Sequence, residues 1–220
     1  MHERDPLDVI PAELRQVLRG RTDWFLIGGH AVRCLSPYRP SRDVDIGVGS
    51  AEALADLFEH MQSSGRVEVL ERSEDTIHLH FEGINVSLFV LDLLTAHVVD
   101  RRIDVTGLLA TKLHAILDRG TRRDFFDLYV ILQTHSLGIA ECLAAMKEVY
   151  GRRVNEPLLL RALTYFDDAD REPPLQGEGP EDFGIVKDFF LSRVGNLIVP
   201  PTRALRIQGN VVDVAPVEAE

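Results

Sequence analysis

The stretch WFLIGGHAVRCLSPYRPSRDVDIGV, residues 24–48, decides the fold of this chain. An apolar run ends at Gly28 and Gly29, a short basic connector follows, and Asp43 and Asp45 lie inside a second apolar run. We interpret this order as a strand, a phosphate-binding turn, a short helix and a metal-binding strand. Successive side chains of a strand alternate between its faces, so the two carboxylates point the same way, about 7 Å apart. At that spacing they can bind one or two hard cations between them.

The composition is that of an acidic globular protein. The 220 residues are 45% hydrophobic and 27% charged, with a net charge of −11, which is typical of one or two small domains. Non-specific nucleic-acid binding needs a basic surface, so the charge argues against it. A polynucleotide substrate stays open because Arg33, Arg39 and Arg42 cluster around the opening stretch. The acidic surface equally suits a basic protein partner.

Two features bear on the compartment. No run reaches about 18 consecutive apolar residues and the N-terminal segment is charged, so we expect neither a membrane span nor a signal peptide. Cys34 and Cys142 are too few for a disulfide framework and lack the spacing of a structural zinc site. We therefore expect a cytoplasmic protein with reduced thiols.

The first half of the chain alternates between helical and strand patterns. Apolar residues recur at helical spacing from Leu54 to Met61, after the good N-cap Ser50. Three later strands give the sheet one apolar face and one largely polar face, which carries His78 and His80. The expected elements are a leading helix at 7–19, strands at 24–27 and 43–48, short and long helices at 31–35 and 51–62, and strands at 66–72, 76–82 and 84–91.

The second half predicts helices. Strand patterns end near residue 95, and an acidic segment rich in Pro and Gly at 167–182 reads as a solvated loop. The helices are expected at 106–119, 122–134, 138–150, 156–166 and 183–194. We predict an α/β (α+β) fold, a mixed sheet with flanking helices at 1–95 followed by a helical domain at 96–200 and a tail at 201–220, with the ligand cleft between the two domains.

The glycine pair and the D-x-D pair together indicate a nucleotide site more strongly than either motif alone. Glycines let the backbone approach a ligand closely, and a helix that begins after them offers N–H groups to a phosphate. Two carboxylates beside the same crevice can bind the Mg²⁺ that a triphosphate also needs. An ordinary tight turn and a solvated strand face are the structural alternatives. With Arg39 and Arg42 alongside, we favour the functional interpretation.

These residues resemble a known family. GGHAVRCLSPYRPSRDVDIGV is similar to the opening motif of the nucleotidyltransferases related to DNA polymerase β, and specifically of the AbiEii/AbiGii toxin family. The segment ATKLHAILDRGTRRDFFDLYVIL resembles the later motifs of that family, a helix that bears a lysine followed by Arg-Asp-x-x-Asp-Leu on the next helix. The resemblance spans about residues 20–150.

The resemblance implies a nucleotidyltransferase-like fold and a set of site residues. It implies that Gly28, Gly29 and Ser41 contact the triphosphate of an NTP, that Asp43 and Asp45 bind Mg²⁺, that Lys112 contacts the nucleotide, and that Asp124 and Asp127 complete the catalytic site. We add Arg39, Arg42 and His30 as candidate nucleotide-binding residues from their positions beside the motif.

The residues of the later segment leave alternatives open. Lys112 and Arg119 share one helical stripe, which suits a cationic wall, although either side chain can snorkel from the margin of a core. Asp124 suits the first turn of a helix, and Asp127 can form a routine i, i+4 pair with Arg123. His30 lies at a helix start, where it either touches the ligand or faces solvent.

One position departs from the family pattern. Related nucleotidyltransferases place a third carboxylate on a neighbouring strand, and the counterpart here is Ser87. Glu82 or Asp92 can substitute for it, and of these strand parity favours Glu82. Otherwise Asp124 and Asp127 bring the charge, or catalysis is reduced. A metal site at His78 and His80 lacks a third ligand, so we favour a polar sheet face.

The resemblance implies a toxin of the toxin-antitoxin type with transferase activity. The reaction expected is Mg²⁺-dependent transfer of a nucleotide monophosphate from NTP to a hydroxyl of RNA, such as tRNA, or of a protein, and a cognate antitoxin is the implied partner. Two alternatives stay open: a small-molecule nucleotidyltransferase of the antibiotic-modifying type, and a nucleotide-binding or partner-binding module without turnover.

Overall fold

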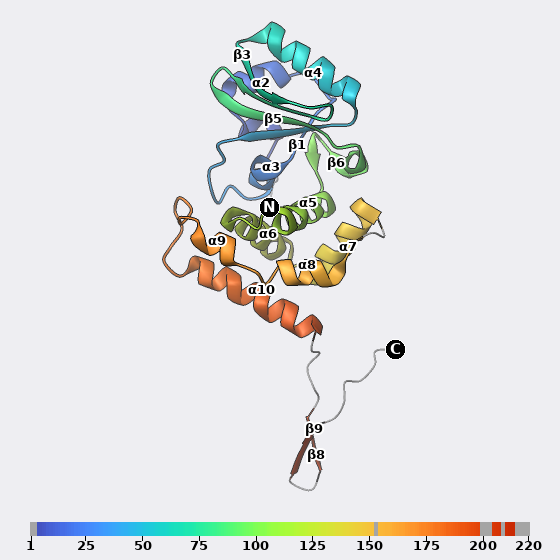
Figure 1. Ribbon diagram of the computed structural model, residues 1–220, viewed down its shortest axis with the longest axis vertical. Helices are drawn as coiled ribbons and strands as arrows, with labels where there is room; N and C mark the ends of the chain where they lie inside the picture. The colour runs from blue at the N-terminus through green and yellow to red at the C-terminus, as the bar shows by residue number, and fades with distance from the viewer. Residues whose placement is uncertain (1–3, 152–153, 199–203, 208–209, 214–220) are drawn as a thin grey trace.

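A seven-stranded mixed sheet forms one part of the protein, and a set of helices lies below it (Figure 1). The computed structural model describes residues 4–151, 154–198, 204–207 and 210–213. This architecture confirms the predicted α/β fold with a mixed sheet, flanking helices and a helical C-terminal part. The strands of the large sheet are β1 Phe25–Leu26, β2 Val44–Val48, β3 Val67–Arg72, β4 Thr76–Phe81, β5 Ile84–Val90, β6 Val98–Val99 and β7 Arg102–Ile103.

The strand order is β3-β4-β5-β2-β1-β7-β6. β2 runs parallel to β5 and β1 runs parallel to β7, and the other pairs are antiparallel. The register sets Asp45 of β2 opposite Ser87 of β5, and Ser87 opposite His78 of β4. These three residues therefore form one row across the middle of the sheet.

The two faces of the sheet have different neighbours. Val44 and Ile46 of β2 are fully buried, and helix α4, Ala51–Ser64, packs over their face with Leu57 and Met61 also fully buried. The Ser50 hydroxyl caps α4 by accepting a hydrogen bond from the Ala53 N–H at 3.2 Å, as the sequence predicts. Because side chains alternate along a strand, the opposite face carries the polar residues of β2, β4 and β5.

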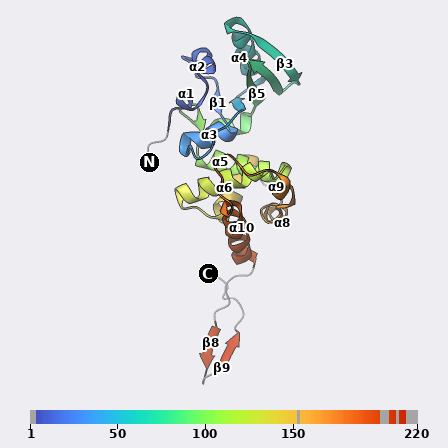
Figure 2. The same ribbon diagram turned by 90° about the vertical axis from the view of Figure 1, so that its left-hand side faces the viewer.

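The helices below the sheet form the second layer. α5 and α6 lie between the sheet and α10 in both views (Figures 1 and 2), and α3 contacts β2, α5 and α6. Phe125 of α6 packs against Phe166, Phe183 and Phe190 in the core of this layer. The remaining helices are α1 Pro6–Val9, α2 Ala12–Leu18, α3 Gly28–Leu35, η1 Asp92–His97 (3₁₀), α5 Val105–Asp118, α6 Arg122–His135, α7 Ile139–Tyr150, α8 Glu156–Ala162, α9 Asp167–Arg171 and α10 Asp182–Ile198.

The structure differs from the predicted elements at several points. The leading helix is two short helices, because Pro11 begins the second one with an extended backbone. The short helix of the opening stretch begins at Gly28 rather than after the glycines, and the helix predicted to end at 166 ends at Ala162. The segment 167–182 is not wholly a loop, since it contains α9, and its Glu178 accepts a hydrogen bond from Arg122 at 3.0 Å.

The sheet also continues past residue 95, where strand patterns were expected to end. β6 and β7 are two residues each, too short to show a periodicity, and β7 joins the sheet through parallel pairing of Leu26 with Arg102. In the predicted tail, β8 Ala204–Ile207 and β9 Asn210–Asp213 pair as a two-stranded antiparallel sheet. Residues 201–203, 208–209 and 214–220 of that tail lie outside the described residues. The domain limits themselves stay a prediction.

A search of the described residues for membrane spans finds no single helix with the length and apolar character to cross a bilayer. One pair of helices passes by length and composition alone when its members are taken together, α6 with α7, and these two are bent by 106° at the break between them.

Candidate active site

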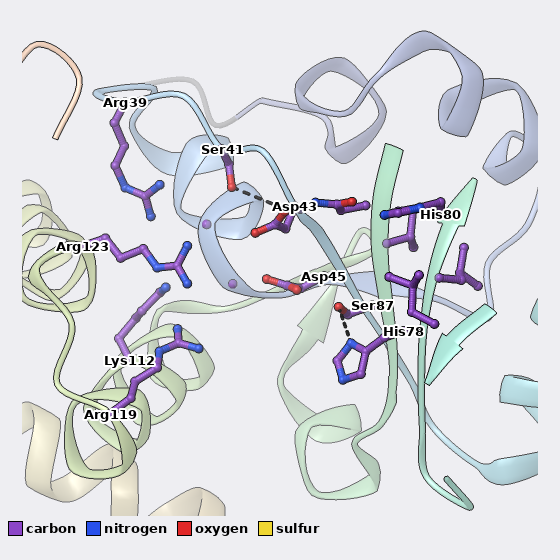
Figure 3. Close-up of a pocket in the computed structure, with 16 residues that line it drawn as sticks. Arg39, Ser41, Asp43, Asp45, His78, His80, Ser87, Lys112, Arg119 and Arg123 are labelled. Carbon is purple, nitrogen blue, oxygen red and sulfur yellow. Dashed lines mark hydrogen bonds between the residues drawn. The ribbon is translucent and has the colours of Figure 1, made fainter. Parts of the chain in front are cut away.

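A cavity of about 490 Å³ lies between the polar face of the sheet and helices α5 and α6 (Figure 3). It brings together most of the residues that the sequence predicts for a nucleotide and metal site. Those that line it are Gly28, Gly29, Arg39, Ser41, Asp43, Asp45 and Lys112. The other polar side chains of its lining are His78, His80, Asn85, Ser87, Arg119 and Arg123. Of these, the sequence predicted only Arg119 for the site, in a cationic wall with Lys112.

The glycine pair shapes one corner of this cavity. Gly28 has a φ of +62°, a left-handed conformation that glycine adopts without strain. A Cβ at Gly28 would lie within 3.0 Å of Asp45 Oδ2, and a Cβ at Gly29 would lie 2.6 Å from Ser41 Oγ. The turn therefore needs glycine at both positions, because larger residues would collide with the polar side chains of the connector and of β2.

Asp45 lines the cavity from β2, and Asp43 lines it from the position just before that strand. Asn85 donates a hydrogen bond from Nδ2 to Asp43 Oδ1 at 2.9 Å. Burial raises the pKa of Asp45, and the charge of Asp43 adds to this effect while that of Lys112 opposes it. A cation beside the pair would relieve this unfavourable negative charge.

The donor set at these two aspartates suits Mg²⁺ better than a closed metal site. The described residues contain no group of three His, Cys, Asp or Glu side chains arranged to hold a metal. Mg²⁺ is commonly held by one or two carboxylates, with water and substrate phosphates as its other ligands. Asp43 and Asp45 therefore fit a metal that arrives with a nucleotide.

Cationic side chains form the wall opposite the aspartates. Figure 3 shows Lys112, Arg119 and Arg123 directed from the helices toward Asp43 and Asp45. Lys112 is 4% exposed, so it is a buried part of the cavity wall rather than a snorkelling surface lysine. Arg123 comes from α6, whereas Lys112 and Arg119 come from α5, and no spacing in the sequence reveals that the two helices present their cations to one cavity.

Asp124 and Asp127 lie behind this wall and do not line the cavity. Both are 0% exposed. Asp127 Oδ2 accepts from Lys112 Nζ at 2.7 Å and from Arg39 at 2.6 Å, so it is not held in the predicted pair with Arg123. Asp124 accepts two hydrogen bonds from Arg119, at 2.8 and 2.9 Å.

The charge of these two carboxylates is fixed by their cationic partners. Burial by itself would raise both pKa values, but Lys112 and Arg39 outweigh it at Asp127, and Arg119 and Lys112 outweigh it at Asp124. The pKa of each is consequently lowered, and both stay ionised. They orient the cationic wall and have no oxygen on the lining of the cavity.

His30 and Arg42 lie outside the cavity lining. His30 is 2% exposed, and its Nδ1 lies 3.0 Å from the backbone oxygen of Asp43. Burial, with a further contribution from Arg33, lowers the pKa of His30 to about 4, so the ring is neutral and Nδ1–H donates to that oxygen. It faces neither ligand nor solvent. Arg42 is exposed.

Ser87 occupies the place where a third carboxylate was expected, directly opposite Asp45 on the neighbouring parallel strand. The favoured substitute, Glu82, is wrong: it lies at the β4–β5 turn, where it accepts a hydrogen bond from the Arg66 N–H at 2.6 Å. Asp92 begins η1 and is also absent from the cavity lining. What Ser87 contacts instead is His78, whose Nδ1 lies 2.9 Å from Ser87 Oγ.

Comparison with known families agrees with this geometry. Residues 101–185 match the model of the family described as nucleotidyl transferase AbiEii toxin, type IV TA system. The predicted resemblance to the AbiEii family is confirmed. The AbiEii match covers the cationic wall and its two buried aspartates, whereas the glycine and D-x-D motifs lie before its first residue.

Two individual proteins are similar to most of the chain. The uncharacterized protein aq_aa25 of Aquifex aeolicus (strain VF5) is 28% identical over 160 residues, which cover 68% of this chain and 77% of that protein. A crystal structure from H. pylori, provisionally described as a nucleotidyltransferase, aligns with a TM-score of 0.51 at 14% identity and covers 84% of this chain and 94% of that one. The structural likeness supports the fold, and the AbiEii match supports a transferase.

Proposed function

We propose that this protein is a Mg²⁺-dependent nucleotidyltransferase of toxin type. It transfers a nucleotide monophosphate from NTP to a hydroxyl of RNA, such as tRNA, or of a protein side chain, and releases pyrophosphate. One observation carries the proposal: Asp43 and Asp45 face the cations Lys112, Arg119 and Arg123 across a single cavity. Carboxylates on one side and cations on the other suit a substrate that carries both a metal and several phosphates.

Each wall of the cavity has a separate task in this reaction. Gly28, Gly29 and Ser41 form a corner where the triphosphate can approach the backbone closely. Lys112, with Arg119 and Arg123, binds the phosphate oxygens. Arg39 contributes in part, because its guanidinium both lines the cavity and donates to Asp127 at 2.6 Å.

Asp43 and Asp45 would hold the Mg²⁺, which neutralises the charge that develops on the phosphates during transfer. Their own contribution is position: Asp45 projects from β2, Asp43 immediately precedes that strand, and Asn85 donates to one oxygen of Asp43 at 2.9 Å. Asp124 and Asp127 act as positioning residues in this proposal. They accept hydrogen bonds from Arg119 and Lys112 and so keep both side chains in place on the cavity wall.

The proposal also covers the partner, the cellular compartment and the domain division. The type IV toxin family implies a cognate antitoxin as a partner. We place the reaction in the cytoplasm, because NTP and tRNA are found there. We keep a division into a nucleotidyltransferase-like part at 1–95, a helical part at 96–200 and a tail at 201–220, with the cavity formed by side chains from both sides of residue 95.

The test is transfer of label from each α-labelled NTP in turn, with Mg²⁺ and either total tRNA or cell extract. We expect label on a macromolecule for one or more nucleotides, and its loss in Asp43→Ala and Asp45→Ala. Asp56→Ala is the matched control, since it removes an exposed carboxylate of α4 outside the cavity and should transfer normally. Binding of nucleotide without transfer, unchanged in both cavity variants, would contradict the proposal.

A small-molecule acceptor is the second candidate, and one observation favours it. On the sheet side the cavity is lined by Leu70, His78, Leu79, His80, Asn85, Val86 and Ser87, so the described lining offers no Lys or Arg there for a polynucleotide backbone. Label recovered on a small molecule from the extract, with none on tRNA or protein, would select this candidate. Ser87 in place of a carboxylate keeps the third alternative, a binding module without turnover, as an outcome of the same test.

A further inference from the structure

A row of three polar side chains crosses the floor of the cavity from Asp45 to His78. Asp45 of β2 is the register partner of Ser87 on β5, and Ser87 is the register partner of His78 on β4. Register partners on adjacent strands have side chains on the same face, with strands about 4.8 Å apart. All three residues line the cavity (Figure 3), so the pair Ser87–His78 lies beside the metal-binding position.

The imidazole of His78 is held in one orientation. Its Nδ1 lies 2.9 Å from Ser87 Oγ, and its ring packs edge-on against Phe89 with the ring centroids 5.7 Å apart at 80°. Within the described part of the chain no hydrogen-bond partner is recorded for Nε2. A ring fixed at one nitrogen and open at the other, on the wall of a reaction cavity, has the arrangement of a general base.

We propose that His78 is the general base of the transfer reaction and that Ser87 positions it, so that the pair does the work of the missing third carboxylate. The inference rests on the proposed nucleotidyltransferase function. Nδ1–H of His78 donates to Ser87 Oγ, which leaves the lone pair of Nε2 available to the acceptor. Serine by itself cannot take a proton at neutral pH, so the imidazole behind it supplies the basicity.

The step balances without any further reactant. The acceptor O–H bond breaks and its proton moves to His78 Nε2, while the acceptor oxygen forms a bond to the α-phosphorus of the NTP. The bond from the α-phosphorus to the bridging oxygen breaks, and pyrophosphate leaves with that electron pair. The imidazolium afterwards returns its proton to solvent.

Other groups on the cavity wall are poorer candidates. His80 lies in the neighbouring row, opposite the Asn85 that donates to Asp43, and its Nδ1 lies 3.7 Å from Glu68 at the edge of the sheet. The acids of the described lining are Asp43 and Asp45, which the metal occupies. The lysine and arginines of the opposite wall are cationic and cannot accept a proton. His78 is therefore the histidine of the cavity that lies in register with Asp45 and whose ring Ser87 holds.

The experiment uses His78→Gln, Ser87→Ala, Ser87→Asp and the double variant Ser87→Asp with His78→Gln. For each protein we would measure single-turnover transfer, the affinity for a non-hydrolysable NTP analogue with Mg²⁺, and the melting temperature. His114→Gln is the matched control, because it removes an exposed histidine of α5 that does not line this cavity.

We expect His78→Gln to slow transfer on the order of 100-fold or more, the usual contribution of a general base, with analogue affinity and melting temperature unchanged. Ser87→Ala should slow transfer less, because the base stays but loses its orientation. Ser87→Asp restores a third carboxylate beside Asp45, so transfer by the double variant should match that by Ser87→Asp alone. If His78 had only a structural role, adding His78→Gln to Ser87→Asp would still lower transfer.

Several results would overturn the inference. If wild type transfers in an Asp43-dependent manner and His78→Gln transfers equally well, His78 is not the base, and the proposed function survives. If wild type itself gains the mass of a nucleotide and Ser87→Ala does not, Ser87 is the acceptor and not a positioning residue. If wild type transfers to no acceptor, the proposed function and this inference fail together.

Discussion

Replacing the buried His30 of α3 tests how the unfolding free energy of the protein depends on pH. His30 donates to the Asp43 backbone oxygen from a 2% exposed position, and burial lowers its pKa from 6.5 to about 4. As pH falls through 6.5 the unfolded chain takes up a proton at His30, while the folded protein does not until about pH 4. Stability is therefore lost over this range, by about 2 kcal/mol of unfolding free energy at about pH 5 relative to about pH 7.5.

His30→Asn removes the titration and keeps the hydrogen bond, because the amide nitrogen of asparagine can donate in place of Nδ1. We would measure the unfolding free energy by urea denaturation of both proteins across this pH range. Wild type should lose about 2 kcal/mol more than the variant on going to about pH 5, since the other titrating groups are common to both. Parallel curves for the two proteins would refute the reasoning, because they would mean that His30 can accept a proton in the folded state.

Three further outcomes follow from the cavity. Gly28→Ala should cut transfer on the order of 100-fold while the protein stays folded, because the new Cβ displaces the Asp45 carboxylate; activity assays with circular dichroism check this. Asp127→Asn should lower the unfolding free energy by about 3 to 5 kcal/mol in urea, because Lys112 and Arg39 lose their buried counter-charge. EDTA should abolish transfer, and added Mg²⁺ should raise the melting temperature of wild type but not of Asp45→Asn.

Elements with a long, regular pattern could be predicted from the sequence. α4 combines a Ser50 cap with a continuous apolar stripe, β4 alternates strictly between buried and polar side chains, and β5 does so from Asn85 to Leu88. Such patterns depend only on local geometry, a period of 3.6 for a helix and 2 for a strand. The same period placed Asp43 and Asp45 on one face, and the structure has both on the lining of one cavity.

Short elements and ion-pair partners could not be predicted. β6 and β7 are two residues each and exist because β1 offers an edge for pairing. Asp127 has Arg123 at i−4, yet it pairs with Lys112 and with Arg39, which is 88 positions away in the chain. Neither outcome is encoded in a local spacing, because both depend on which elements pack against each other.

By itself, the sequence determined that a glycine turn is followed by a D-x-D strand, because residue type and local periodicity set both features. It also determined that Ser87 stands where a third carboxylate was expected, and the parallel register with Asp45 agrees. Only the tertiary structure decided which side chains share the cavity with those carboxylates. The cations of α5 and α6, and the imidazole of His78 behind Ser87, reach the cavity through strand pairing and helix packing between distant segments, and no local pattern carries that information.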